Sequence, residues 1–188
     1  MLPWGHAAVG YLCYTLWLRA RNRHPPADLA VVALAVGTQF PDLIDKPLAW
    51  TFSVLPSGRS LGHSLVITAI LAFGLWQLAQ RFDRHREASA FLCGHLAHIV
   101  ADMLPAVIAG EWIQLRTLAW PLVPVYVFPD EQDRSIIEFF LTLEPAAIPT
   151  SGVVLTLVAV VVWVQDGRPG LGFLRGQTLS TFIRRFRS

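Results

Sequence analysis

Two histidines and an aspartate recur at helical spacing within one apolar stretch of the sequence. The stretch runs from Ala88 to about Gly110, and His98 and Asp102 stand four residues apart in it. On an α-helix this spacing puts both side chains on one face, and His95 lies within roughly 60° of them. One helix could therefore offer a metal ion both an imidazole nitrogen and a carboxylate oxygen. The same pair could instead form a buried hydrogen bond that packs two helices together.

The composition around this motif is typical of an integral membrane protein. Of the 188 residues, 54% are hydrophobic and 15% are charged, whereas a soluble domain averages about 25% charged residues. The mean hydropathy is +0.48. The net charge of +2 is small, and nothing in its distribution indicates a nucleic-acid-binding surface. Ionisable side chains inside a membrane segment usually face the interior of a helix bundle and mark a functional site.

Five apolar segments predict an all-α, polytopic transmembrane bundle of about five spans. They cover approximately residues 2–18, 27–44, 61–78, 88–110 and 148–164. The last segment is rich in valine, but a lone strand cannot satisfy its backbone hydrogen bonds in lipid, so we interpret it as a helix.

A longer connection and a basic tail complete the chain. Residues 111–147 are rich in Trp, Pro and acidic side chains and predict a loop at the membrane–water interface, with 122–128 extended and 136–143 a short helix. Residues 167–188 predict a basic amphipathic segment on an anionic membrane surface. The domain organisation is then a transmembrane domain over 1–166 and a cytoplasmic tail over 167–188.

The basic residues predict the orientation of the bundle. When the connections are numbered alternately, one side receives 11 of the 15 basic residues and the other receives four. The crowded side holds Arg19, Arg21, Arg23, Arg81, Arg84, Arg86, Arg168, Arg175, Arg184, Arg185 and Arg187, and the other holds Lys46, Arg59, Arg116 and Arg134. Cytoplasmic loops of membrane proteins are rich in Lys and Arg, so the N-terminus and residues 111–147 are expected outside and the C-terminus in the cytoplasm.

This topology brings six potential metal ligands from four helices to the outer half of the bundle. They are His6, Asp42, Asp45, His63, His98 and Asp102. The two aspartates on the second segment can point the same way if the helix continues past Pro41, which could instead end it. Mixed imidazole and carboxylate ligands suit Zn²⁺, Mn²⁺ or Fe²⁺. Six ligands exceed the needs of one tetrahedral zinc, so the site could hold either one ion or two ions bridged by an aspartate.

Four motifs follow one another in the order of a known family. They are Pro41-Asp42-Leu43-Ile44-Asp45, Arg59-Ser60-Leu61-Gly62-His63-Ser64, His98-Ile99-Val100-Ala101-Asp102 and Leu118-Ala119-Trp120-Pro121-Leu122. With His6 before them, they resemble the LexA-binding, inner-membrane-associated family of metal-dependent hydrolases. That family has an early His, then Pro-Asp-x-Asp, His-Arg-x-x-Thr-His-Ser, Ser-His-x-x-x-Asp and a Leu-Trp-Pro segment. The resemblance covers residues 6–122 and implies that the same six residues form the metal site.

The chain departs from the family pattern at three places. Asp42 and Asp45 are three residues apart here, where the family has them two apart. Gly58 and Gly62 stand where the family has His and Thr. His95 stands where an apolar or aromatic residue is usual, which makes it a candidate replacement ligand.

The sequence therefore predicts a membrane-embedded, metal-dependent hydrolase that acts on a lipid or lipid-linked substrate, a phosphoester above all. A metal-activated water would be the nucleophile, with zinc expected ahead of manganese and iron. Asp45, Asp42 or His95 would act as base, and Arg59, close to His63, would bind a substrate phosphate or carboxylate. The alternative is a non-catalytic membrane binding or regulatory protein, or an ion transporter. In those proteins the His/Asp cluster would hold helices together or carry ions.

Overall fold

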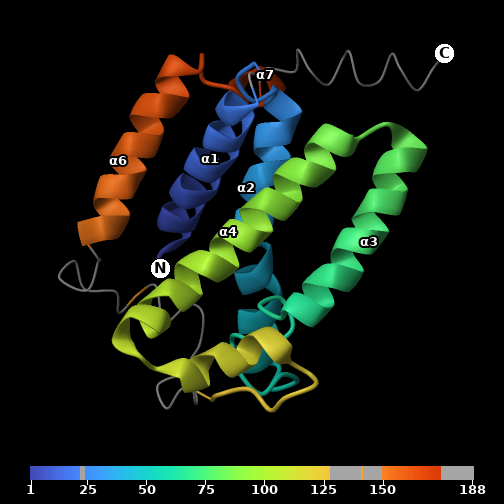
Figure 1. Ribbon diagram of the computed structural model, residues 1–188, viewed down its shortest axis with the longest axis vertical. Helices are drawn as coiled ribbons and strands as arrows, with labels where there is room; N and C mark the ends of the chain where they lie inside the picture. The colour runs from blue at the N-terminus through green and yellow to red at the C-terminus, as the bar shows by residue number, and fades with distance from the viewer. Residues whose placement is uncertain (22–23, 128–140, 142–149, 175–188) are drawn as a thin grey trace.

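Helices make up all the regular structure in the residues that the computed structural model describes, 1–21, 24–127, 141 and 150–174 (Figure 1). The predicted all-α fold is thus confirmed for these residues. The elements are α1 (Pro3–Ala20), α2 (Asp28–Lys46), a π-helix (Pro47–Thr51), α3 (Leu65–Phe82), α4 (His85–Ala109), a 3₁₀ helix (Trp112–Ala119), α6 (Thr150–Gln165) and the short α7 (Leu171–Leu174).

Each of the five apolar segments forms a helix, and α3 differs most from the expected bounds, because it begins and ends four residues later than predicted. The helix begins at Leu65 because the Ser64 hydroxyl oxygen accepts hydrogen bonds from the backbone N–H groups of Val66 and Ile67, at 3.1 and 3.3 Å. This side-chain cap satisfies two backbone donors that have no partner inside the helix. Residues 61–64 therefore belong to the preceding loop, and that loop carries His63.

Helix α4 lies at the centre of the bundle. It packs against α2 and α1 on one side and against α3 on the other, while α6 lies along α1 (Figure 1). Glycines allow the closest of these contacts, since a Cβ atom added at Gly94 of α4 would lie 2.5 Å from the carbonyl oxygen of Leu34 on α2. Small residues that let backbones approach are typical of helix packing in membranes.

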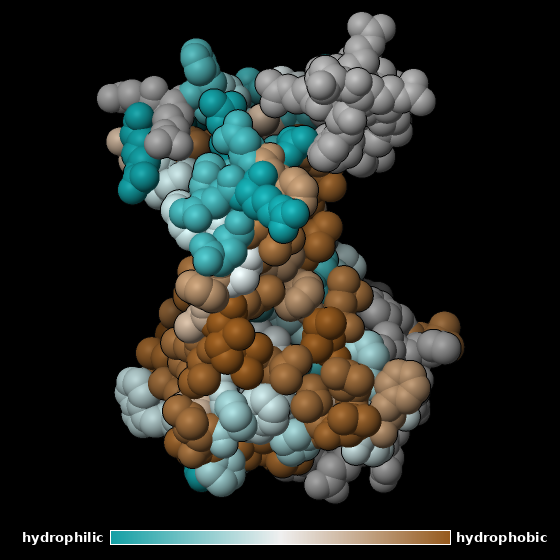
Figure 2. Space-filling model, turned by 90° about the vertical axis from the view of Figure 1, so that its right-hand side faces the viewer, coloured by the Kyte–Doolittle hydropathy of each residue, from teal (hydrophilic) through white to brown (hydrophobic). Residues whose placement is uncertain are grey.

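Two of the described helices, α3 and α4, are long and apolar enough to cross a membrane, and α6 is a shorter apolar helix. Large apolar side chains project outward from them, including Phe73 and Ile108, which are 68% and 78% exposed. Figure 2 shows hydrophilic residues gathered at the end where α3 and α4 meet, with a largely hydrophobic surface beyond it. An apolar exterior of this kind suits a lipid environment.

The connection after α4 and the tail are described in part. A 3₁₀ helix occupies 112–119, where no regular element was predicted, and residues 122–127 have no regular secondary structure. The short helix predicted at 136–143 lies almost wholly outside the described residues, as do Phe128 and most of the basic tail. In the described start of the tail, the N–H of Gly170 donates to Oδ1 of Asp28 at 2.6 Å and so ties α7 to the beginning of α2.

Candidate metal centre

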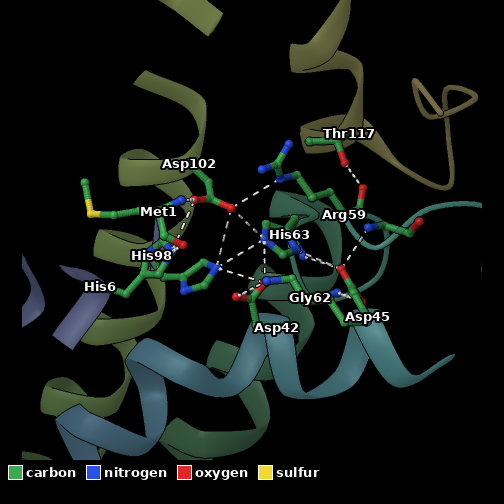
Figure 3. A network of polar contacts seen from close by, with 12 residues as sticks. Met1, His6, Asp42, Asp45, Arg59, Gly62, His63, His98, Asp102 and Thr117 are labelled. Carbon is green, nitrogen blue, oxygen red and sulfur yellow. Dashed lines mark hydrogen bonds and ion pairs between the residues drawn. The ribbon is translucent and has the colours of Figure 1, made fainter. Parts of the chain in front are cut away.

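Four side chains from three parts of the fold converge on one buried point (Figure 3). Asp42 comes from α2, His63 from the loop before α3, and His98 and Asp102 from α4. One ligand atom of each lies within 4.8 Å of the corresponding atom of every other, and all four are buried. These four residues, the central group below, could hold a metal ion.

Asp42 reaches the central group because Pro41 lies inside α2 and does not end it. The helix continues to Lys46, whose ammonium donates to Oδ2 of Asp42 at 2.6 Å. Oδ1 of the same carboxylate is buried and has no hydrogen-bond partner among the described residues. A buried acceptor without a partner is costly and rare. Because this oxygen faces the two imidazoles, it is available to bind a cation.

The hydrogen bonds of the two histidines fix which ring nitrogen carries the proton. Nδ1 of His98 lies 2.6 Å from the carbonyl oxygen of Thr38, and Nδ1 of His63 lies 2.8 Å from Oδ2 of Asp45. A carbonyl and a carboxylate can only accept, so both Nδ1 atoms donate. The Nε2 atoms of His63 and His98 are then left 3.2 Å apart with their lone pairs toward each other. Such a pair requires a cation between or beside the two nitrogens, either a proton or a metal ion.

The spacing of the four ligand atoms fits a small divalent ion. Nε2 of His63 lies 3.6 Å from Oδ2 of Asp102 and 3.9 Å from Oδ1 of Asp42. Nε2 of His98 lies 3.9 and 3.7 Å from the same two oxygens. In a tetrahedral zinc site with bonds of 2.0–2.1 Å, neighbouring ligand atoms are about 3.3 Å apart. The four nitrogen–oxygen distances exceed this value by 0.3–0.6 Å, and the two carboxylate oxygens lie within 4.8 Å of each other, so a bound ion would draw the carboxylates inward.

The electrostatic surroundings of His63 favour a positive charge. The imidazole is fully buried, which by itself lowers its pKa, but the Asp102 and Asp45 carboxylates raise it, and the net shift is upward from the ordinary value. The same carboxylates that favour a proton on this ring would favour a metal cation beside it.

Asp45 lies nearly one helical turn beyond Asp42 and contacts the other ring nitrogen of His63. Its carboxylate is fully buried and points into the loop before α3, where it contacts His63 and three backbone N–H groups. Its oxygens are not part of the central group. The nearby cations pair with the central group: Lys46 with Asp42 and Arg59 with Asp102.

The two glycine departures from the family pattern lie where the loop is closely packed. A Cβ atom at Gly62 would stand 2.7 Å from the Cα atom of Pro41, and one at Gly58 would stand 2.9 Å from Nε1 of Trp50. Neither position has room for a larger side chain without movement of its neighbour. Gly62 therefore lets the loop that carries His63 lie directly on α2, and Gly58 lets it lie against the π-helix.

His6 lies beside the central group, next to the second oxygen of Asp102. Its Nε2 atom is 3.3 Å from Oδ1 of Asp102 and 3.1 Å from the carbonyl oxygen of Met1, while its ring stacks on His98 with centroids 3.8 Å apart. The Met1 amino group also donates to Oδ1 of Asp102, at 3.0 Å. The Asp102 carboxylate thus separates His6 from His63, with one oxygen toward each.

Arg59 forms the rim of the site. Its Nε–H donates to Oδ2 of Asp102 at 3.2 Å, and its side chain is 27% exposed. The backbone around it is fixed by the Ser57 hydroxyl, which accepts from the Arg59 N–H, and by the Thr117 hydroxyl, which donates to the Arg59 carbonyl. The guanidinium therefore connects the solvent-accessible edge with the buried carboxylate.

His95 faces α3 and not the central group. The Thr68 hydroxyl donates to the carbonyl of Ser64 at 2.7 Å, so at its 2.9 Å contact with His95 it can only accept, and Nε2 of His95 carries the proton. The rings of Phe40 and Phe91 pack nearby. The structure thus places His95 in a polar contact between α3 and α4.

Comparison with protein families matches residues 1–168 to the YdjM inner membrane protein family. Comparison with curated proteins and with solved structures gives no match. The family match contains every residue of the central group together with His6, Asp45 and Arg59, and it extends beyond the motifs through α6. The chain belongs to the YdjM inner membrane protein family, which is the LexA-binding inner-membrane hydrolase family that its motifs resemble.

Proposed function

We propose that Asp42, His63, His98 and Asp102 hold a divalent metal ion, with zinc expected ahead of manganese and iron. The observation that carries the proposal is the convergence of two imidazole lone pairs on a point that also faces the unpartnered Oδ1 of Asp42. Both imidazoles donate their other N–H to an oxygen, which is the usual arrangement of metal-bound histidines. His6, beside the outer oxygen of Asp102, is the candidate ligand for a second ion that Asp102 would bridge.

We propose further that the protein is a metal-dependent hydrolase of a lipid or lipid-linked phosphoester. A bound divalent ion would supply Lewis-acid chemistry and make water a better nucleophile at neutral pH. Arg59 stands at the rim with a planar guanidinium, which suits it to bind a phosphate beside the centre. Any proton transfer that involves Asp45 would pass through His63, which Asp45 contacts directly. His95 contacts Thr68 and no member of the central group, so we assign it no proton role.

The lipid substrate class depends on the topology that we propose, with five spans and the N-terminus outside. Helices α1, α2, α3, α4 and α6 contain 16–25 residues, close to the length that crosses a bilayer. The described residues of the arginine-rich side lie around the far ends of these helices from the central group, namely Arg19, Arg21, Arg81, Arg84, Arg86 and Arg168 (Figure 1). In this orientation the central group lies in the outer half of the membrane, where an amphiphile could reach it laterally.

The test is the metal content of the protein purified in mild detergent. We expect about one ion per chain, or two if His6 binds a second, retained in His95→Ala and lost in His98→Ala. The two variants remove the same side chain from the same helix one turn apart, so the comparison separates a ligand from a buried packing residue. No stoichiometric metal after reconstitution with Zn²⁺, Mn²⁺ or Fe²⁺ would refute the proposal.

Activity is tested next on phospholipids and lipid phosphates with the metal-loaded protein. A hydrolase predicts that His98→Ala abolishes turnover while thermal unfolding in detergent still shows a folded protein. A structural cluster predicts instead that the melting temperature falls first and that no substrate is turned over by the wild type. A transporter predicts metal flux into liposomes without hydrolysis.

A further inference from the structure

The carboxylate of Asp45 accepts four hydrogen bonds from N–H donors, although it lies beside a candidate metal centre. Oδ1 accepts from the N–H of Gly62 at 2.7 Å. Oδ2 accepts from the N–H groups of Ser60 and His63 at 2.8 and 3.3 Å, and from Nδ1–H of His63 at 2.8 Å. Each carboxylate oxygen has two lone pairs, so the three donors at Oδ2 leave no room for another partner there, whereas Oδ1 has one donor. A metal ion could bind Oδ2 of Asp45, the oxygen that contacts the His63 ring, only by displacing some of these donors.

Asp42 shows the opposite pattern one turn earlier on the same helix. One of its oxygens is held by Lys46, and the other is buried without a hydrogen-bond partner among the described residues and faces the two imidazoles. The two aspartates of α2 therefore point at different targets, Asp42 at the central group and Asp45 at the loop that carries His63 (Figure 3).

We infer that Asp45 is a positioning residue: it fixes the ring orientation and the Nδ1–H tautomer of His63, so that Nε2 faces the central group as a metal ligand. Without an acceptor at Nδ1, the proton can move to Nε2, and the lone pair that would bind the metal is lost. The three backbone bonds add a second effect, because they hold residues 60–63 in the turn that brings the ring to this point. This inference rests on the proposed metal site, but its first test requires no metal.

The first test is nitrogen-15 NMR of the imidazoles in the metal-free protein at alkaline pH, where the rings are neutral. We expect the proton of His63 on Nδ1 in the wild type and a shift toward Nε2 in Asp45→Ala. His95 is the internal reference, since its proton is fixed on Nε2 by Thr68 in both proteins. A wild-type His63 that carries its proton on Nε2 overturns the inference, whether or not the protein binds metal.

The second test is metal affinity, measured by chelator competition, in a graded pair of variants. Asp45→Asn keeps one oxygen to accept from His63, whereas Asp45→Ala keeps none. We therefore expect Asp45→Ala to weaken binding about 10- to 100-fold and Asp45→Asn to weaken it less. Two results together would identify Asp45 as a ligand and overturn the inference. The first is an equal loss of metal affinity in Asp45→Asn and Asp45→Ala. The second is a change in the absorption spectrum of the cobalt-substituted protein that matches the change caused by Asp42→Asn. Unchanged affinity in both would overturn it too.

Asp166→Ala is the matched control for the loss of a buried carboxylate. Asp166 accepts from Tyr11 and Arg19 at the other end of the bundle, at 2.8 and 3.0 Å. We expect this variant to lower the melting temperature without changing metal affinity. If Asp45→Ala does not fold, the wild-type tautomer and the Asp45→Asn affinity still decide the question. Failure of the proposed function is a separate result, the absence of metal from the wild type.

Discussion

Gly94→Ala, which adds one methyl group between α2 and α4, is expected to loosen both the bundle and the metal centre. The added Cβ atom would lie 2.5 Å from the carbonyl oxygen of Leu34 and 3.0 Å from the backbone nitrogen of Thr38. Ordinary van der Waals contact begins near 3.4 Å, so α2 and α4 must separate by about 0.9 Å at this point. Overpacking of this kind typically destabilises by about 1–3 kcal/mol.

The same separation acts on the metal centre through Thr38. Its carbonyl oxygen accepts the Nδ1–H of His98 at 2.6 Å, and a displacement of about 0.9 Å takes this bond to the limit of hydrogen-bonding distance. Because loss of such an orienting contact typically weakens metal binding about 10- to 100-fold, we expect at least a tenfold loss in Gly94→Ala. Thermal unfolding and chelator competition in detergent measure the two effects.

Gly74→Ala is the matched control, because the same change on α3 meets no atom within 4 Å. Helix propensity alone then applies, and this variant should be stabilised by up to about 1 kcal/mol with unchanged metal affinity. If Gly94→Ala unfolds at the wild-type temperature and binds metal with wild-type affinity, then α2 and α4 do not approach as closely as the structure has them.

Three further predictions concern the contact between Thr68 and His95, the cation at the rim and the effect of pH on metal binding. Thr68→Val removes the acceptor of the His95 Nε2–H, so we expect a loss of about 0.6–1.7 kcal/mol in thermal unfolding, with unchanged metal content, and little further loss when His95→Leu is added. Arg59→Gln removes the cation at the rim, so we expect the metal to be retained while inorganic phosphate inhibits turnover at least tenfold more weakly; equal inhibition would remove Arg59 from substrate binding. Acidification is expected to release the metal, because His63 and His98 must be deprotonated to bind it. Chelator competition measures metal affinity across pH, and an affinity that does not fall at low pH would contradict this prediction.

Much of the fold and most of the central group could be predicted from the sequence, since both follow from spacing along single segments. Each of the five apolar runs forms a helix, and this could be predicted because the length of an apolar run is read from consecutive residues alone. Likewise, His98 and Asp102 are four residues apart, and on a helix this spacing places them on the same face. The sequence left the path of α2 at Pro41 open, and the continuous helix decides which way Asp42 points.

The polar contacts around the ligands could not be predicted, because most of them are made by backbone atoms. The partner of His98 is the carbonyl oxygen of Thr38, and three of the four donors to Asp45 are backbone N–H groups. Any residue type supplies such atoms, so no sequence motif marks them. The glycines give the one indirect signal, since a glycine in a helix or loop often marks a close approach of two backbones.

The different placements of His95 and His98 show what the spacing rule can and cannot decide. Both are buried histidines of α4, three residues apart, and the sequence put both near the face of Asp102. The rotation of roughly 60° between them is enough to turn His95 toward α3, where the Thr68 hydroxyl accepts from it. His98 turns toward α2 and His63. Which histidine becomes a ligand therefore depends on which neighbouring helix offers the acceptor for its N–H, and this can be known only once the helices are packed.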